Sequence, residues 1–172
     1  MKKAIIIILM FLFISACSYE QPTCSTCNQD IQILSRIIDG DTFELSDGSK
    51  IRVLGIDYPD ISKDRIAKWI EMDLDERNVK KCYYEGIEWM KQYEGKDVSL
   101  IQDDDEMNTD KYGRKLRYVL INEGDIGYSL IQKGYAVTYD PTSPFCSFCE
   151  KYYSMEIAVR NNKSGCLWND TL

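Results

Sequence analysis

The sequence predicts an α+β domain built round a small β-barrel. Five short segments rich in β-branched and aromatic residues alternate with turn signals, and longer segments between them repeat their apolar residues with a helical period. Several short strands combined with three or so helices are typical of this architecture. The length of 172 residues fits one domain with a modest extension, since domains commonly hold roughly 100–200 residues.

The strands are predicted at 31–38, 42–45, 51–56, 96–102 and 115–121, with a last short strand at 135–139. Asp47-Gly48 separates the second strand from the third. This dipeptide tolerates the positive φ angles of a tight turn, so it predicts a hairpin. The acidic run 103–106 lacks the alternating ligand spacing of a calcium loop and predicts a solvated loop instead.

Helical spacing of apolar residues predicts helices at 65–74 and 79–93, a short helix at 126–132 and a terminal helix at 147–162. Gly134 follows the third of these segments. Glycine is the residue most often found just past the end of a helix, so we expect this helix to end there.

The first residues have the pattern of an export signal. Lys2 and Lys3 precede an apolar run from 4 to 16, which is shorter than the about 20 residues of a membrane-spanning helix. Ile14-Ser15-Ala16-Cys17 resembles the lipobox of bacterial lipoproteins, and this resemblance implies a membrane anchor on Cys17; an ordinary signal peptide is the alternative. We expect a signal at 1–16, a tether at 17–30, a domain at 31–172 and a monomer facing the extracellular or periplasmic side.

The charge and composition restrict the chemistry. Loss of Lys2 and Lys3 with the signal would change the formal net charge from −7 to −9, whereas proteins that bind nucleic acid through many phosphate contacts are usually basic. Any phosphate binding must therefore come from a few local arginines and a metal ion. The sequence contains no histidine, which excludes His-based acid–base catalysis and His-ligated zinc.

Two segments bring acidic residues close to turns. Asp39-Gly40-Asp41-Thr42 by itself is typical of a plain turn. Arg52, however, lies on an otherwise apolar strand and needs an anionic partner. Asp57 and Asp60 follow on either side of a proline, and with Asp41 they could converge on a hard cation such as Ca²⁺.

A third segment, Thr109-Asp110-Lys111-Tyr112-Gly113-Arg114, offers two cations and a phenol in a glycine turn. Arginine in such a turn could bind a phosphate through two parallel hydrogen bonds. Taken in order, the three segments resemble the staphylococcal nuclease (thermonuclease) family. The resemblance extends from about residue 31 to 168 and includes the closing Gly165-Cys166-Leu167-Trp168.

The resemblance implies an OB-fold, a five-stranded barrel with three helices, that hydrolyses DNA and RNA with Ca²⁺ and leaves 3′-phosphates. By position, Asp41 and Asp57 resemble the carboxylate ligands of Ca²⁺, and the backbone carbonyl of Tyr58 resembles a third ligand. Arg52 and Arg114 resemble the two catalytic arginines. Lys111 and Tyr112 correspond to contacts with the terminal phosphate of a nucleotide, and Tyr139 to a position near the same pocket.

One departure from the family concerns the residue expected to accept the proton of the attacking water. The family has glutamate where this sequence has Asp60, and the following loop, with the helical stretch 65–74, is longer than usual. A shorter side chain can fall out of reach of its proton. An OB-fold module that binds nucleic acid without efficient cleavage is therefore the alternative. A scaffold lipoprotein would explain the tether and the cysteines, but not Arg52 or Arg114.

Six further cysteines allow two structural interpretations: Cys24, Cys27, Cys82, Cys146, Cys149 and Cys166. The two C-x-x-C pairs could together ligate Zn²⁺, whereas an even number of cysteines in an exported protein favours disulfides. Either interpretation would tie the tether to the segment before the last helix. Cys82 and Cys166 would then remain as a pair. A thioredoxin-like role is disfavoured, because neither C-x-x-C opens a helix after a βαβ pattern.

Overall fold

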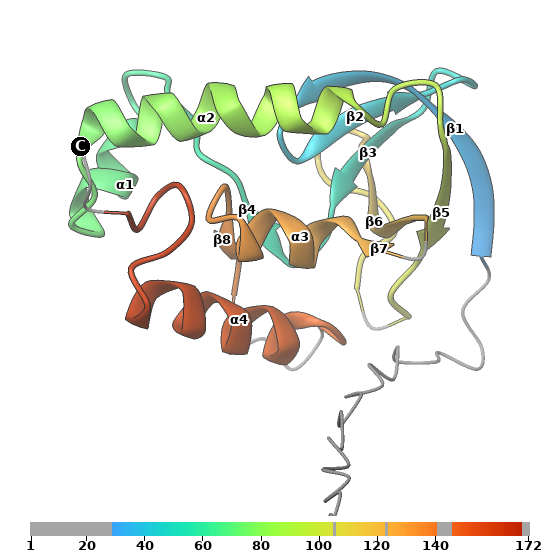
Figure 1. The fold of residues 1–172 in the computed structure, drawn as a ribbon. Coiled ribbons are helices and arrows are strands. Elements are labelled where there is room, and N and C mark those ends of the chain that lie inside the picture. The colour runs from blue at the N-terminus through green and yellow to red at the C-terminus, as the bar shows by residue number, and fades with distance from the viewer. Residues whose placement is uncertain (1–28, 105, 123, 141–145, 170–172) are drawn as a thin grey trace, which may run out of the picture.

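Five strands close into a barrel in the computed structural model, which describes residues 29–104, 106–122, 124–140 and 146–169 (Figure 1). They are β1 (Gln29–Asp39), β2 (Thr42–Leu45), β3 (Lys50–Val53), β5 (Asp97–Ile101) and β6 (Lys115–Ile121). The order is β3-β2-β1-β5-β6, with antiparallel neighbours throughout, and a parallel pairing of β3 with β6 closes the ring. The predicted α+β barrel is confirmed.

β1 is the strand that allows closure, because it belongs to both halves of the barrel. Its first residues pair with β5 and its later residues pair with β2. The register shifts between Leu34 and Arg36 and again between Ile37 and Asp39. Such irregularities bend a strand and increase its twist, so β1 can curve from one neighbour to the other. The predicted hairpin at Asp47-Gly48 joins β2 to β3.

The prediction of one continuous strand at 51–56 is wrong, because the segment forms two strands. β3 ends at Val53, and β4 (Ile56–Asp57) leaves the barrel to pair with β8 (Val137–Thr138). Gly55 separates them with φ of +78°, a conformation that glycine adopts without a steric penalty. A Cβ atom on Gly55 would also lie 3.1 Å from the Sγ atom of Cys146. This break carries Asp57 away from the barrel wall. The predicted strand 135–139 is confirmed in the shorter form of β8.

The described residues form four helices: α1 (Ile66–Glu71), α2 (Glu76–Lys91), α3 (Ile126–Gln132) and α4 (Cys149–Asn161). α2 and α3 pack against barrel strands, α4 packs against α3, and α1 packs against α2. In Figure 1, α3 lies between α2 and α4 beside the barrel. Asp75 caps α2 by accepting hydrogen bonds from two backbone N–H groups, and Asp125, which belongs to the two-residue strand β7 (Gly124–Asp125), caps α3. Gly134 lies just past α3 with φ of +68°, and its N–H donates to the carbonyl of Ile131, as predicted for a helix end.

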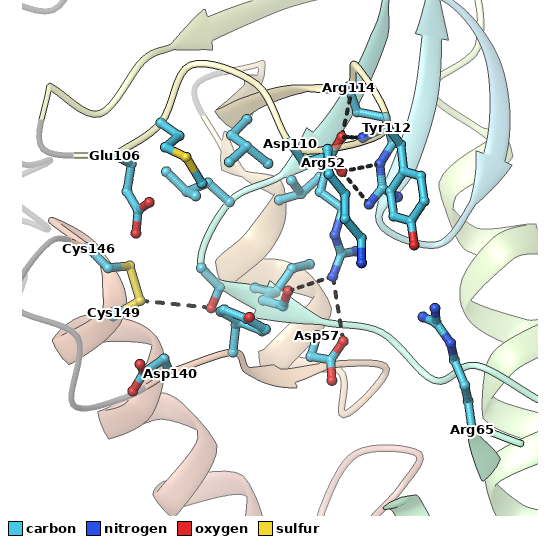
Figure 2. A pocket seen from close by; sticks show the side chains of 18 residues that line it. Arg52, Asp57, Arg65, Glu106, Asp110, Tyr112, Arg114, Asp140, Cys146 and Cys149 are labelled. Carbon is cyan, nitrogen blue, oxygen red and sulfur yellow. Dashed lines mark hydrogen bonds and ion pairs between the residues drawn. A yellow bond between two sulfur atoms is a disulfide. The ribbon is translucent and has the colours of Figure 1, made fainter.

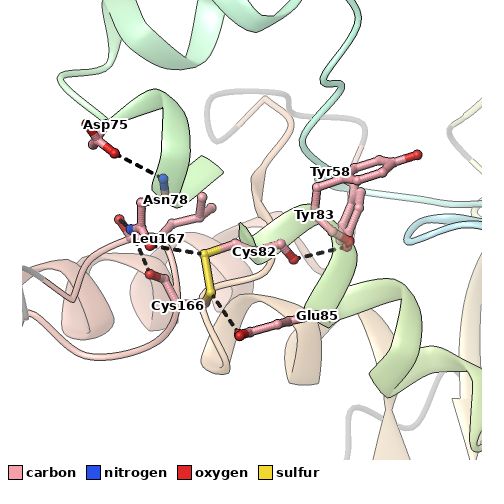
Figure 3. Close-up of a disulfide and its surroundings, with 8 residues drawn as sticks. All are labelled: Tyr58, Asp75, Asn78, Cys82, Tyr83, Glu85, Cys166 and Leu167. Atoms are coloured by element: carbon pink, nitrogen blue, oxygen red, sulfur yellow. Dashed lines mark hydrogen bonds between the residues drawn. A yellow bond between two sulfur atoms is a disulfide. The ribbon is translucent and has the colours of Figure 1, made fainter. Parts of the chain in front are cut away.

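Two hydrophobic clusters hold these elements together. The larger fills the barrel and the space under α3 and α4. The smaller joins α1, the first half of α2 and the C-terminal segment through Trp69, Val79 and Leu167. The disulfide between Cys82 and Cys166 lies at this second cluster and confirms the predicted pair (Figure 3).

The second disulfide does not tie the tether to the segment before the last helix, as the two C-x-x-C motifs had led us to expect. Cys146 is bonded to Cys149, within its own C-x-x-C motif. The disulfide interpretation is therefore correct for these residues, but a zinc site that uses them and a bridge from them to the tether are both wrong. Cys17, Cys24, Cys27 and the expected signal lie outside the described residues. Each helix in the described ranges is too short or too polar to span a lipid bilayer.

Asp103 corrects the prediction of a solvated loop at 103–106. Its side chain is buried and accepts hydrogen bonds from the Tyr118 hydroxyl (2.6 Å) and from the backbone N–H of Ser147 (2.9 Å). A buried phenol needs an acceptor, and Asp103 supplies one. Burial raises the pKa of Tyr118, and the hydrogen bond to Asp103 adds to the increase. The carboxylate thereby ties the end of β5 to the start of α4.

Candidate active site

A pocket of about 520 Å³ opens at the side of the barrel, between β3, β4, the turn before β6 and the start of α4 (Figure 2). Its apolar wall includes Val53, Leu54, Ile56 and Leu116. Its cationic residues are Arg52, Arg65, Lys111 and Arg114. A pocket of this size that combines an apolar wall with a few charged groups is typical of a site for a small ligand or part of a larger one.

Arg52 projects from β3 into this pocket, and its side chain is only 17% exposed. Its guanidinium contacts the carboxylate of Asp41, and Nη2 lies 3.5 Å from Asp57 and 3.3 Å from the carbonyl of Ile56. The predicted anionic partner is thus confirmed. Burial lowers the pKa of Arg52, while the carboxylate of Asp57 acts in the opposite direction. Arginine stays charged even so, which makes it a fixed positive group.

Arg114 reaches the pocket from the turn that precedes β6. Asp110 shapes this turn by accepting hydrogen bonds from the backbone N–H groups of Tyr112 (2.9 Å) and Arg114 (3.0 Å). The Arg114 side chain donates to the same carboxylate through Nε (2.7 Å) and Nη2 (2.6 Å). Burial raises the pKa of Asp110, but the hydrogen bonds from Arg114 outweigh it and leave the pKa below its ordinary value.

Thr42 connects the two arginines. Nη1 of Arg114 donates to its hydroxyl (3.2 Å), and that hydroxyl donates to Oδ1 of Asp41 (2.8 Å). Asp41 in turn binds Arg52. The three segments identified in the sequence therefore meet in one hydrogen-bonded group, although 72 residues separate Thr42 from Arg114.

Lys111, Tyr112 and Tyr139 line the pocket at the positions where nucleotide contacts were expected. Tyr112 is 64% exposed, and the centroid of its ring lies 5.0 Å from Nζ of Lys111 and 5.6 Å from Cζ of Arg114. A hydrogen bond from Lys111 lowers the pKa of Tyr112, and Arg65 adds to the decrease. The cations Lys111, Arg114 and Arg65 thus lie around the phenol of Tyr112.

Asp60 lies apart from this group and does not line the pocket. Its side chain is 40% exposed, accepts a hydrogen bond from the N–H of Ser62 (2.9 Å) and lies 3.5 Å from Nε of Arg65. Burial raises the pKa of Asp60, but the Ser62 hydrogen bonds and the charge of Arg65 leave it below its ordinary value. The Asp60 carboxylate is thus paired with Arg65 and is not part of the pocket lining.

Asp41 and Asp57 offer the type of oxygen ligand that Ca²⁺ takes, and both contact Arg52. Asp57 also pairs with Lys68. Among the described residues, no three acidic, histidine or cysteine side chains form a metal-binding group. The two carboxylates fit a calcium ion by their chemistry, provided that backbone carbonyls, water or substrate complete the ligand set. The Tyr58 ring is buried, and its hydroxyl donates to the carbonyl of Tyr83.

Comparison with known proteins decides the family. The model of staphylococcal nuclease homologues matches residues 50–170. The chain belongs to this nuclease family. The family match includes Arg52, Asp57 and Arg114, whereas Asp41 precedes it. The chain is also similar to an uncharacterized protein of Methanocaldococcus jannaschii, with 29% identity over 147 residues, 78% of this chain and 69% of the relative.

Two cations of the site were missed in the sequence. Arg65 and Lys68 lie at the start of α1, where Arg65 pairs with Asp60 and Lys68 pairs with Asp57. Residues three apart on a helix share a face, so both can point toward the acidic turn that precedes the helix. The three-residue spacing of Arg65 and Lys68 could therefore have indicated, from the sequence alone, that both cations face the acidic turn. The helix predicted at 65–74 is confirmed in the shorter form of α1, but no role in the site was assigned to its cations.

Proposed function

We propose that this protein is a calcium-dependent nuclease that hydrolyses phosphodiester bonds of DNA and RNA and leaves 3′-phosphates. The observation that supports it is the convergence of Arg52 and Arg114 on one pocket, each held by a carboxylate. Phosphodiester hydrolysis concentrates negative charge on the non-bridging oxygens in the transition state. Two preorganised guanidinium groups stabilise this charge, and they do so more strongly in a partly buried site than in water.

Asp41, Asp57 and the backbone carbonyl of Tyr58 would hold the calcium ion. The ion, when bound, supplies positive charge beside the phosphate and makes water a better nucleophile. Asp60 would accept a proton from the attacking water. To do so its carboxylate must turn from Ser62 and Arg65 toward the pocket.

A second candidate is a module that binds nucleic acid but cleaves it poorly. The position of Asp60 outside the pocket favours this alternative, because a general base must come within about 2.6–3.2 Å of the proton that it removes. The two candidates share the phosphate site and differ only in whether a carboxylate can reach the water.

Cleavage of labelled single-stranded DNA and RNA, with Ca²⁺ or with a chelator, tests the proposal. The parent protein should cleave only with Ca²⁺ and produce 3′-phosphate ends. Arg114→Ala should lower the rate by about 100-fold or more, as loss of one group that stabilises transition-state charge commonly does. Arg77→Ala is the matched control, since Arg77 is exposed at the start of α2 and does not line the pocket.

The same assay separates the two candidates when Asp60→Glu is included. The nuclease proposal expects efficient cleavage by the parent and little gain in this variant. Binding without cleavage by the parent, together with a large gain in Asp60→Glu, would instead establish the binding module.

We also propose that the nuclease is exported and anchored to a membrane through a lipid on Cys17, where it meets extracellular or periplasmic nucleic acid. The apolar run from 4 to 16 and the lipobox-like Ile14-Ser15-Ala16-Cys17 support this proposal. Metabolic labelling with a radioactive fatty acid should mark the parent and a Cys24→Ser control. Label that persists in Cys17→Ser would contradict the anchor.

A further inference from the structure

We propose that Arg65 is a further substrate-binding residue, which holds the phosphate next to the one bound by Arg52 and Arg114. The inference rests on the proposed nuclease function and adds Arg65 to the terminal-phosphate contacts that the family resemblance implies for Lys111 and Tyr112. Arg65 comes from the N-terminus of α1, outside the three segments that define the family resemblance.

The position of Arg65 is the first argument. It lines the same pocket as Arg52 and Arg114, and its side chain is 67% exposed. In Figure 2 its guanidinium points toward Tyr112, from the side of the pocket opposite Glu106. An exposed arginine at a pocket wall is accessible to an incoming anion without any movement of the backbone.

Arg65 can exchange its contact with Asp60 for a contact with a phosphate, because the contact with Asp60 is weak. Its ion pair with Asp60 is a single contact of 3.5 Å between two exposed side chains. Such pairs contribute about 0–1 kcal/mol. A phosphate group accepts parallel hydrogen bonds from a guanidinium and can replace this contact.

The charge around Tyr112 is the second argument. Nζ of Lys111 lies 5.0 Å and Cζ of Arg114 lies 5.6 Å from the centroid of its ring, and Lys111 and Arg65 lie close enough to its hydroxyl to lower its pKa. Three cations therefore surround one exposed phenol in a chain whose formal net charge is −7. Cations gathered against the overall charge of a protein indicate a site for an anion.

The acidic residues on the wall of the pocket opposite Arg65 also favour a phosphate on the Arg65 side. Glu106 and Asp140 line the pocket beside the Cys146–Cys149 disulfide (Figure 2). Their negative charge disfavours a phosphate on that side. A strand whose first phosphate is bound by Arg52 and Arg114 would thus place the neighbouring phosphate on the side of Arg65.

Calorimetric titration with two small probes tests this subsite, with Ca²⁺ present throughout. Thymidine 5′-phosphate carries one phosphate, and thymidine 3′,5′-bisphosphate carries two. The parent should bind the bisphosphate more tightly than the monophosphate. Arg65→Gln should weaken bisphosphate binding about tenfold and leave monophosphate binding unchanged, because a hydrogen bond to a charged group commonly contributes about 1.5 kcal/mol. Arg65→Lys should give an intermediate result.

Arg77→Gln is the control for loss of one positive charge, and it should bind both probes like the parent. A ratio of the two affinities that stays the same in Arg65→Gln would overturn the inference, whether both affinities are retained or both fall. Absence of binding of either probe to the parent would contradict the proposed function itself. Loss of both probes in Arg114→Ala, with an unchanged ratio in Arg65→Gln, would reject the Arg65 subsite alone.

Discussion

The guanidinium of Arg114 donates a hydrogen bond of 3.2 Å to the hydroxyl of Thr42. Thr42 belongs to the start of β2, and Arg114 immediately precedes β6, so this contact crosses the site from one strand to another. It holds the guanidinium through Nη1, while Asp110 holds it through Nε and Nη2. The side chain proposed to stabilise the transition state is thus oriented before substrate arrives.

Thr42→Val tests the importance of this orientation. The substitution keeps the shape of the side chain but removes the hydroxyl, so Arg114 loses one of its two side-chain partners. We expect kcat on single-stranded DNA to fall about tenfold, equivalent to one hydrogen bond. Thr42→Ser should stay close to the parent. Equal rates in both variants would show that Asp110 alone positions Arg114.

Gly86→Ala should destabilise the protein although alanine is the better helix former. A Cβ atom on Gly86, in α2, would overlap the hydroxyl of Tyr58. Forcing extra atoms into a packed core costs about 1–3 kcal/mol. Denaturant unfolding of Gly86→Ala, Tyr58→Phe and the double variant measures this effect. Because Tyr58→Phe removes the obstructing oxygen, the double variant should be less destabilised than the sum; strict additivity would contradict the proposed clash.

The two disulfides should differ in their contribution to stability. Cys82 and Cys166 are 84 residues apart in the sequence, whereas Cys146 and Cys149 are three apart. By the loop-entropy relation, removal of the first should cost about 4.5 kcal/mol and removal of the second about 2 kcal/mol. Unfolding of the two double cysteine-to-alanine variants gives both values. A larger loss for the short bridge would mean that local packing, not chain entropy, dominates.

Asp110→Asn should lower the free energy of unfolding by an amount that depends on pH and vanishes in acid. The hydrogen bonds from Arg114 place the pKa of Asp110 below its ordinary value of 3.8 in the folded protein, despite burial. A carboxyl group with a lowered folded pKa stabilises the protein above its unfolded pKa and loses this contribution as the pH falls through the folded pKa.

The parent should therefore be more stable than Asp110→Asn at pH 6, and this advantage should shrink as the pH falls below about 4. Unfolding curves from pH 2 to pH 7 check the difference. An advantage that does not change with pH would show that the turn geometry, and not the charge of Asp110, is responsible.

Local signals in the sequence determined much of this protein. The hairpin at Asp47-Gly48, the bounds of the helix at 126–132 and its end at Gly134 all depend on residues within one or two turns of the chain. The need of Arg52 for an anion also follows from its place on an apolar strand. The absence of histidine excluded whole classes of chemistry without reference to structure.

The tertiary structure decided which distant groups meet. The predicted strand breaks at Gly55, where a Cβ atom would meet Cys146 and Tyr152, and Asp103 is buried with its carboxylate against the Tyr118 hydroxyl. Cys146 bonds to its near neighbour Cys149, and Arg65 enters the pocket from a helix that the family resemblance did not explain. The break at Gly55 and the burial of Asp103 depend on closure of the barrel and on the packing of helices against it, and no pattern within a short segment carries that information. The spacing of Arg65 and Lys68 indicates a shared helix face, but only the tertiary structure places Arg65 at the pocket.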